Sequence, residues 1–557
     1  MQRFLATFLV QLLTFGLLVQ AAPPMPPGPP VPPPGPAVPP GPPKPPGPPP
    51  PGGAPVQHLV VIFQENISFD HYFATYPTAL NLPGEPVFTA LPDTPSVNGL
   101  SGGLLSDNPN ALNTAINGTG AVNPFRLSRA QAATNDQGHN YMPEQMAFHG
   151  GLMDQFPFSV GTAGPPPGSP AQALTKGQVM AYFDGNTVTA LWNYAQRFAM
   201  SDNSYNTTFG PSTPGAINLI SGQTNGVINN VKGTGGVVAD GNGGLTDIGD
   251  ADPTNDVCST PTGETFQMAG RNVGDMLNGA GITWGFYEGG FDLSVVNSDT
   301  STGCNRTTTS LITNSKKVDY IPHHQPFQYY PSTANPTHAR PNSVSSIGFT
   351  DPANHQYDTH DFFDAVSAGN YPAVNFLKAP GFQDGHAGYS DPLDEQQFVV
   401  QVINFLQQKG DWEHTVVIIA YDDSDGWYDH QMSPIVNQSA TSQDALLGSG
   451  SCGAAALAMA GVNSGTLHAQ GRCGYGPRLP LLVISPWAKQ NFVDHTVTDQ
   501  SSILRFIEDT WLKGERIGQG SFDAVAGPLT NMFDFSGPPN KMPYLLDGVT
   551  GEVASPR

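Results

Sequence analysis

The chain has 557 residues, of which 38% are hydrophobic, so it is long enough for a sizeable core and disorder throughout is excluded. Its 45 acidic and 22 basic residues give a formal net charge of -23 at pH 7. A surface with this charge repels a phosphate backbone, and we therefore predict no nucleic-acid partner.

The N-terminus has the parts of a signal peptide. A positive charge at Arg3 precedes an apolar run over residues 4–19, and the small residues Ala21 and Ala22 follow. We predict a signal peptide over residues 1–21 and a secreted or periplasmic protein whose mature form has no transmembrane segment. The alternative is an uncleaved membrane anchor, although the run is short for crossing a bilayer.

Residues 22–55 are nearly all Pro, Gly, Ala and Val, and Lys44 is their only charged residue. This composition predicts a polyproline II linker of roughly 3.1 Å per residue, on the order of 100 Å in all. We expect a passive tether. The alternative is a segment that docks to a cell wall or to a partner.

From residue 56 onwards the sequence alternates between strand and helix patterns. Three short, apolar, β-branched runs have the pattern of strands buried on both faces of a sheet: residues 56–63, 415–421 and 481–485. Weaker strand patterns lie at residues 282–287 and 372–377.

Two helices are predicted where apolar residues recur at helical spacing, at residues 394–408 and 501–512. Together with the strands they predict a three-layer α/β/α sandwich. We place the catalytic domain at residues 56–535 and a C-terminal tail at residues 536–557.

Two long stretches rich in small and polar residues, 222–262 and 296–320, interrupt this pattern. Loops of this length predict lids, or excursions held by disulfides. The chain has four cysteines, an even number that favours two disulfides in an exported protein. Proximity in sequence favours Cys258 with Cys304 and Cys452 with Cys473 among the three possible connectivities.

The three clearest predicted strands each end in polar residues: Glu65 and Asn66, Asp422 and Asp423, and Ser485–Trp487. In open α/β sheets ligands bind beyond the carboxyl ends of the strands, so we expect these tips to share one site. Adjacent buried aspartates repel each other unless a cation lies between them. With oxygens from Glu65 and Asn66, they predict one hard divalent ion such as Mg, Ca, Mn or Fe. The alternative is a solvated acidic turn after each strand.

A turn rich in Gly and Pro, residues 209–218, presents the hydroxyls of Ser212 and Thr213. A nearby metal makes such a hydroxyl easier to deprotonate, although the same residues also form ordinary loops. Imidazoles in a cleft donate to phosphate oxygens or protonate a leaving alkoxide, whereas single histidines are often surface or capping residues. The candidate histidines are His139, His323, His324 and His386.

Several of these segments resemble a known family. Glu65-Asn-Ile-Ser-Phe-Asp-His-Tyr-Phe73 resembles the Glu-Asn-Arg-Ser-Phe-Asp-His-Tyr-Phe signature of the phosphoesterase family that contains bacterial and plant non-specific phospholipases C and AcpA-type acid phosphatases. Residues 421–430 resemble its Asp-Glu-x-x-Gly-x-x-Asp-His motif, and residues 476–480, 485–487 and 499–504 resemble later elements in the same order. The resemblance extends from about residue 57 to residue 512.

This resemblance implies an alkaline-phosphatase-like fold with one divalent metal ion. The implied ligands are Glu65, Asn66, Ser212, Asp422 and Asp423, and Ser212 is also the implied nucleophile. The neighbouring pair His323 and His324, and further phosphate-pocket residues His139 and His386, resemble histidines of the family's site.

The chain also departs from the family pattern. Ile67 stands where Arg is usual, Ala74 where Gly is usual, and Ser212 where many family phospholipases have Thr. The serine nucleophile and the short extension beyond the core favour an acid phosphatase, an exported metal-dependent phosphomonoesterase acting through a phosphoserine intermediate.

The alternative is a phospholipase C that cleaves phosphatidylcholine-type diesters, with a choline pocket built by cation–π contact. The candidate aromatic residues for that pocket are Trp284, Tyr287, Trp427 and Tyr428. The predicted partner is thus a small phosphate ester or a phospholipid head group, and the sequence does not define the oligomeric state. A binding module with a structural metal is a third alternative, which the complete set of ligand residues argues against.

Overall fold

The computed structural model describes residues 55–554, apart from 165–170, 234, 261, 455–458, 463 and 469. The predicted signal peptide, and the linker up to residue 54, lie outside the described residues. Within the described part of the chain, every helix is too short or too polar to cross a membrane.

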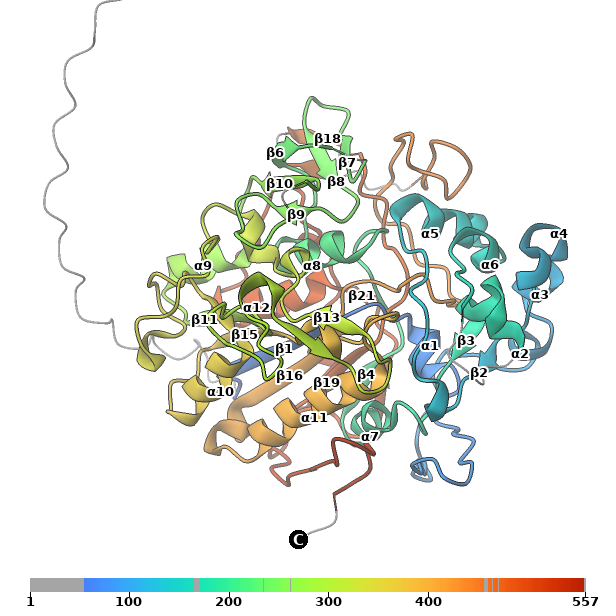
Figure 1. The fold of residues 1–557 in the computed structure, drawn as a ribbon, viewed down its shortest axis with the longest axis horizontal. Coiled ribbons are helices and arrows are strands. Elements are labelled where there is room, and N and C mark those ends of the chain that lie inside the picture. The colour runs from blue at the N-terminus through green and yellow to red at the C-terminus, as the bar shows by residue number, and fades with distance from the viewer. Residues whose placement is uncertain are drawn as a thin grey trace, which may run out of the picture. The chain divides into compact units, whose positions relative to one another are not determined.

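An eight-stranded sheet forms the centre of the fold (Figure 1). Its strands lie in the order β14 (Gln356–Asp358), β11 (Trp284–Glu288), β15 (Val374–Lys378), β1 (His58–Gln64), β16 (Thr415–Tyr421), β19 (Leu481–Ile484), β4 (Ala199–Ser201) and β20 (Phe492–Asp494). β1 pairs in parallel with both β15 and β16, and its register with β16 runs from His58–Thr415 to Gln64–Tyr421. Because of this register, the residues that follow β1 and β16 emerge side by side.

β19 runs opposite to β16, and this corrects one prediction. The Ser485 hydroxyl donates to the Thr415 carbonyl at 2.8 Å, which places Ser485 beside the start of β16 rather than its end. The expectation that Ser485–Trp487 share the site with the other two strand tips was therefore wrong. A short apolar run shows that a strand is buried but carries no information about its direction.

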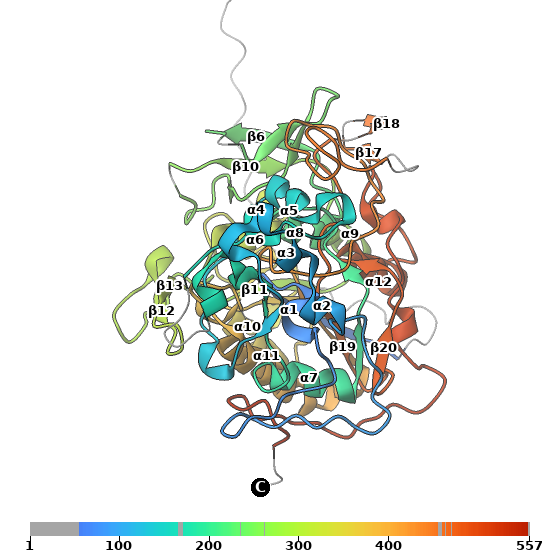
Figure 2. The same ribbon diagram turned by 90° about the vertical axis from the view of Figure 1, so that its right-hand side faces the viewer.

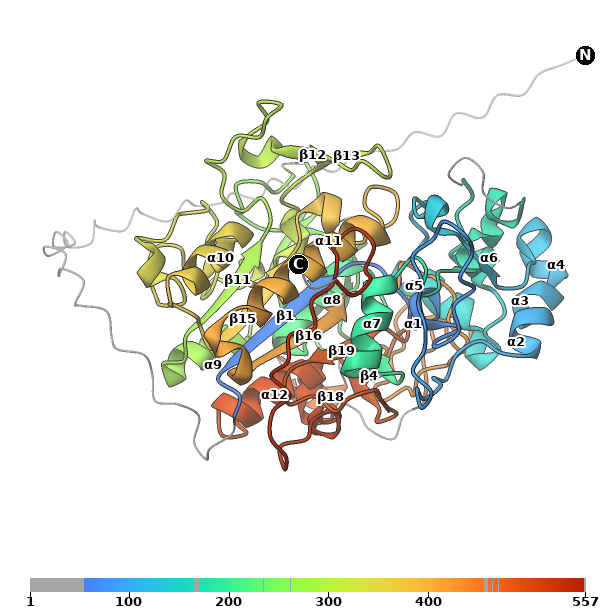
Figure 3. The same cartoon turned by 90° about the horizontal axis from the view of Figure 1, so that it is seen from below.

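Helices cover both faces of the sheet, which confirms the predicted α/β/α sandwich. α7 (Thr189–Arg197), α10 (Thr359–Ser367) and α11 (Pro392–Gln407) lie on one face, turned towards the viewer in Figure 3. α8 (Ser212–Ser221), α9 (Val273–Ala280) and α12 (Ser501–Trp511) lie on the other face, where α8 contacts both neighbours. α11 and α12 are the two helices predicted from the sequence.

Several small elements surround this core. A lobe of short helices, α2 (Gly103–Ser106), α3 (Pro109–Leu112), α4 (Thr114–Asn117), α5 (Tyr141–Phe148) and α6 (Phe156–Ser159), faces the viewer in Figure 2. α1 (Phe69–Phe73) follows β1 closely. The remaining strands are β2 (Phe125–Arg126), β3 (Ala181–Tyr182), β5 (Ser204–Tyr205), β6 (Val227–Val231), β7 (Val237–Ala239), β8 (Leu245–Asp247), β9 (Asp252–Pro253), β10 (Thr265–Met268), β12 (Thr307–Thr309), β13 (Lys316–Val318), β17 (Ala460–Gly461), β18 (Ser464–His468) and β21 (Thr498–Asp499).

The two long polar stretches contain regular structure of their own. Residues 222–262 include β6 to β9, and residues 296–320 include the hairpin of β12 and β13. Disulfides join Cys258 to Cys304 and Cys452 to Cys473, which confirms the predicted connectivity. That these stretches act as lids stays a prediction.

The predicted C-terminal tail packs on α7 and α11. The Asn404 amide donates to the Leu546 carbonyl at 2.7 Å, and the Asn193 amide donates to the Gly551 carbonyl at 2.8 Å. Backbone groups of residues 546–551 are thus satisfied by helix side chains.

Candidate active site

The five predicted ligand residues come together at one edge of the sheet. Glu65 and Asn66 follow β1, Asp422 and Asp423 follow β16, and Ser212 is the first residue of α8. The Ser212 hydroxyl lies 3.1 Å from Glu65 Oε2 and 3.1 Å from Asp423 Oδ2, while the Asn66 N–H donates to Asp422 Oδ1 at 3.0 Å. All five side chains are buried.

Local backbone geometry explains how α8 reaches the strand ends. A Cβ atom at Gly215, one turn into α8, would lie only 2.1 Å from the Asp422 carbonyl oxygen. Glycine at this position therefore lets the start of the helix, and Ser212 with it, approach β16. Asn66 has φ of 60°, a left-handed conformation that asparagine tolerates better than most residues, and its side-chain amide donates to Asp425 Oδ1 at 3.2 Å.

Two buried oxygens of the cluster lack a hydrogen-bond donor among the described residues: Asn66 Oδ1 and Asp422 Oδ2. Burial raises the pKa of both Glu65 and Asp423 well above the usual range, and the carboxylate of Asp422 raises them further. Buried oxygen atoms that lack hydrogen-bond donors, on carboxylates that repel one another, form a suitable binding site for a hard divalent ion. The residues present therefore fit the predicted metal.

Lys378, the last residue of β15, is a member of the cluster that the sequence analysis missed. Its ammonium group pairs with Glu65 Oε1 and lies 3.8 Å from Asp422 Oδ2. Burial opposes the charged form, but the carboxylates of Glu65 and Asp422 raise the pKa of Lys378 above its usual range. The lysine thus offsets part of the negative charge and fixes Glu65 so that Oε2 faces Ser212.

His323 and His324 have different surroundings although they are neighbours in sequence. His324 is buried, and its Nδ1 lies 3.4 Å from Glu65 Oε1; burial lowers the pKa of this histidine well below its usual range. His323 packs edge-on against His324, but its own Nδ1 lies 3.5 Å from Asp252 Oδ1. His324 therefore contacts the ligand cluster, while His323 lies behind it, between His324 and Asp252.

His139 and His386 lie together on another side of the cluster, with ring centroids 6.1 Å apart. His139 Nδ1 is 3.2 Å from Asp425 Oδ1, the oxygen that also accepts from Asn66. Burial would lower the pKa of His139, but the carboxylates of Asp423 and Asp425 raise it well above its usual range. Burial lowers the pKa of His386 to about 4.

Two further buried acids border the site. Glu144 on α5 accepts from the Gly210 N–H at 2.9 Å and from the Ser424 hydroxyl at 2.8 Å, and burial raises its pKa to about 7. Asp384, whose carbonyl accepts from the Glu65 N–H at 2.9 Å, also has its pKa raised by burial to about 7. Glu144 joins the turn before Ser212 to the turn after Asp423.

Comparison with known proteins agrees with this geometry. A model described as the phosphoesterase family matches residues 56–512. The chain belongs to the phosphoesterase family.

Similar curated proteins have phospholipase names. A non-hemolytic phospholipase C of Pseudomonas aeruginosa is 24% identical over 499 residues, which cover 88% of this chain and 59% of that protein. The corresponding protein of Burkholderia pseudomallei is 26% identical over 513 residues, covering 88% and 61%. Phospholipase C A of Mycobacterium tuberculosis is 24% identical over 504 residues, covering 87% and 78%. The chain thus spans about three fifths of the length of the first two relatives.

A solved structure from Vibrio parahaemolyticus, described as a protein in the alkaline phosphatase superfamily, is also similar. It is 11% identical with a TM-score of 0.25, covering 74% of this chain and 76% of that one.

The same family motifs build a second buried cluster, the arginine clamp, made of Asp70, Asp429, His430 and Arg478. Arg478 Nη2 donates to Asp70 Oδ1 and Arg478 Nε to Asp429 Oδ2, both at 3.1 Å. His430 Nδ1 lies 2.7 Å from Asp70 Oδ2. The clamp joins α1, the turn after β16 and the segment before β19.

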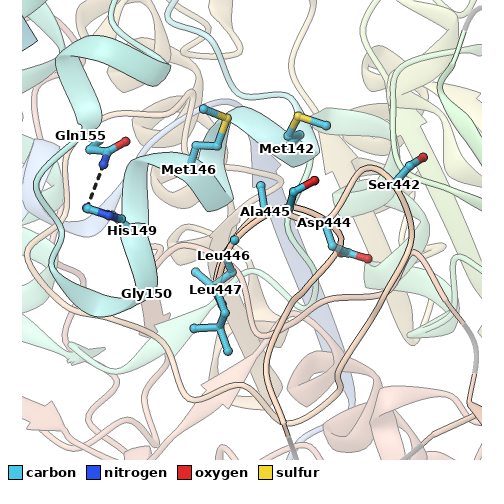
Figure 4. A pocket seen from close by; sticks show the side chains of 12 residues that line it. Met142, Met146, His149, Gly150, Gln155, Ser442, Asp444, Ala445, Leu446 and Leu447 are labelled. Atoms are coloured by element: carbon cyan, nitrogen blue, oxygen red, sulfur yellow. Dashed lines mark hydrogen bonds between the residues drawn. The ribbon is translucent and has the colours of Figure 1, made fainter. Parts of the chain in front are cut away.

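A pocket of about 640 Å³ lies on another side of α5 (Figure 4). Its wall is formed by Met142, Met146, Leu446 and Leu447. The one buried carboxylate in its lining, Asp444, is already satisfied by the Tyr141 hydroxyl at 2.7 Å and by Thr441. None of the lining residues that the structure describes belongs to the phosphoesterase site.

Proposed function

We propose that this chain is an exported, metal-dependent phosphoric ester hydrolase that acts on phosphomonoesters at mildly acidic pH. The observation that supports the proposal most directly is the position of the Ser212 hydroxyl, 3.1 Å from both Glu65 Oε2 and Asp423 Oδ2. A hydroxyl between two buried carboxylates, at the start of a ten-residue helix, is suited to act as a nucleophile towards a phosphate group.

The metal ligands in this proposal are Glu65, Asn66, Asp422 and Asp423 together with Ser212. A divalent ion held there would lower the pKa of the Ser212 hydroxyl and offset the charge of the phosphate. Lys378 would hold Glu65 in place, and the two orphaned oxygens, Asn66 Oδ1 and Asp422 Oδ2, are free to act as ligands.

The reaction then proceeds in two displacements. The Ser212 oxygen attacks phosphorus, the bond from phosphorus to the substrate alcohol breaks, and a histidine gives its proton to the departing oxygen. His139 is the best candidate for this acid, because its Nδ1 lies 3.2 Å from Asp425 Oδ1, a carboxylate outside the ligand set that favours the protonated ring. Water then releases phosphate from the phosphoserine, so the configuration at phosphorus is retained overall.

The surroundings of four aromatic residues support a phosphomonoester rather than a choline phosphodiester as the substrate. Trp284 stacks on His355 at 4.4 Å, and Trp427 stacks on His71 at 3.9 Å. Tyr287 packs on Tyr357 and Phe362, and Tyr428 packs on Phe156. All four are buried, and each packs against a ring outside this set of four, which supports the monoester proposal.

Phospholipase C activity is the second candidate, because the curated relatives named above are phospholipases C. The deciding measurement is kcat/KM for p-nitrophenyl phosphate and for p-nitrophenyl phosphorylcholine between pH 5 and pH 8, with the Ser212→Ala variant as the control for contaminating phosphatase. We expect faster cleavage of the monoester. A preference of tenfold or more for the choline diester, about 1.4 kcal/mol of transition-state binding, would overturn the proposal.

A further inference from the structure

The hairpin of β12 and β13 lies over the loop of residues 379–391, which carries Asp384 and His386. At the hairpin base, Arg306 Nε pairs with Asp319 Oδ2 at 2.9 Å, and the Gly381 N–H donates to the Asp319 carbonyl at 3.0 Å. At the hairpin tip, the Ser315 hydroxyl donates to the Gly388 carbonyl at 3.2 Å. The disulfide at Cys304 anchors the segment that leads into β12. The hairpin is therefore held against this loop at both ends.

Lys317 on β13 is the hairpin residue that extends towards the site. Its Cγ would lie 3.0 Å from a Cβ atom at Gly381, so the lysine stem crosses the backbone of the loop at a glycine. Its ammonium nitrogen lies 3.7 Å from the centre of the Tyr389 ring. The same ring stacks on His386 at 4.3 Å, and its hydroxyl donates to Asp384 Oδ2 at 3.0 Å.

The charge of Lys317 has no direct counterion among the described residues. The residue is half-buried, and no described carboxylate oxygen lies within 4.0 Å of its nitrogen. Burial lowers its pKa, and the more distant charges of Asp384 and Glu65 oppose this shift. The neighbouring Lys316, by contrast, is exposed and pairs with Asp299 at 2.8 Å. Taking an ammonium group partly out of water with an aromatic ring but no carboxylate beside it is costly, and an anionic ligand would offset that cost.

We propose that Lys317 is a specificity-determining residue that favours doubly charged phosphate monoesters over singly charged diesters. The inference rests on the proposed function, because Lys317 would attract the phosphate group that the proposed function places between Ser212 and the histidines. A fixed cation attracts a dianion about twice as strongly as a monoanion at the same distance. Lys317 acts in binding and does not take part in bond making or breaking.

The test uses Lys317→Met, which keeps the apolar stem against Gly381 and Tyr389 but removes the charge. For p-nitrophenyl phosphate we expect kcat/KM to fall about tenfold, mainly through KM, while kcat/KM for the singly charged p-nitrophenyl phosphorylcholine falls only about threefold. Inhibition by inorganic phosphate should weaken about tenfold, which corresponds to about 1.4 kcal/mol. Lys317→Arg should retain both values, and the matched control Lys316→Met should change neither.

Equal losses on the two substrates in Lys317→Met, or an unchanged inhibition constant for phosphate, would overturn the inference. Thermal unfolding and metal content of each variant show whether the protein remains folded and loaded. If Lys317→Met does not fold, the monoester-to-diester ratio and phosphate inhibition of Lys317→Gln give the same test. If the wild-type enzyme cleaves only the diester, the monoesterase proposal fails, and phosphate inhibition of the wild type and the variants still decides the role of Lys317.

Discussion

Two buried polar clusters, built from the same sequence motifs, differ in how far the protein satisfies their polar atoms. In the arginine clamp all four carboxylate oxygens have donors. Asp70 accepts from Arg478 and His430, and Asp429 accepts from Arg478, from the Asp70 N–H and from the Gln431 N–H. In the ligand cluster Asn66 Oδ1 and Asp422 Oδ2 have none among the described residues.

This difference indicates that the arginine clamp stabilises the fold, whereas the ligand cluster has oxygen atoms available to bind a ligand. Asp70, Asp429 and His430 have ligand atoms within 4.8 Å of one another, a spacing that by itself would suit a metal ion. Arg478 already supplies the cation there, and its guanidinium also donates to the carbonyls of Asn98 and Asp202. Carboxylates in close proximity therefore do not identify a metal site unless some of their oxygens lack donors.

The largest expected effect is the loss of turnover in Ser212→Ala without a loss of stability. The variant removes only the nucleophilic oxygen, so we expect kcat to fall about 10⁴-fold or more, while thermal unfolding and metal content stay close to those of the wild type. Thr213→Ala is the matched control and should be far milder. Full loss in Thr213→Ala with an active Ser212→Ala would place the nucleophile one residue further along.

Arg478→Met should lower stability and leave turnover unchanged, because the arginine clamp stabilises the fold. Two buried aspartates would lose their cation, and breaking a buried ion pair costs about 3–5 kcal/mol of unfolding free energy. Urea denaturation measures this loss, and the exposed Arg271→Met, whose partner is Glu515 at 2.9 Å, is the control. The fraction that remains folded should keep its kcat. A stable but inactive Arg478→Met protein would contradict the division between clamp and site.

Asp423→Asn should affect metal binding and turnover together. An amide is a weaker ligand than a carboxylate for a hard cation, so we expect the affinity for the divalent ion to fall on the order of 100-fold. Metal content by mass spectrometry and activity across a metal titration measure the two effects. A fully metallated but inactive variant would instead assign Asp423 to proton transfer.

The sequence predicted the fold and the ligand residues more fully than their surroundings. The apolar runs that became β1 and β16 also located Glu65, Asn66, Asp422 and Asp423, because in-register parallel strands bring their ends together. Lys378 was missed because the predicted strand stopped at residue 377, one position short of it. The roles of Arg478 and Glu144 depend on which oxygens are already hydrogen-bonded, and motif spacing does not encode that.

The smallest expected effect concerns the pH dependence of the clamp. Burial would lower the pKa of His430, but the carboxylate of Asp70, 2.7 Å from His430 Nδ1, raises it above the usual value near 6.5. A histidine with a raised folded-state pKa stabilises the fold fully below its unfolded pKa, and this contribution is lost as the pH rises through the folded pKa. Between pH 6 and pH 9 the unfolding free energy of the wild type should therefore fall more than that of His430→Gln. Urea denaturation at each pH measures the unfolding free energy. The control is the substitution His495→Gln, at an exposed histidine next to Asp202. Parallel pH profiles for the wild type and His430→Gln would show that the histidine is neutral in the folded clamp and that Arg478 alone carries its positive charge.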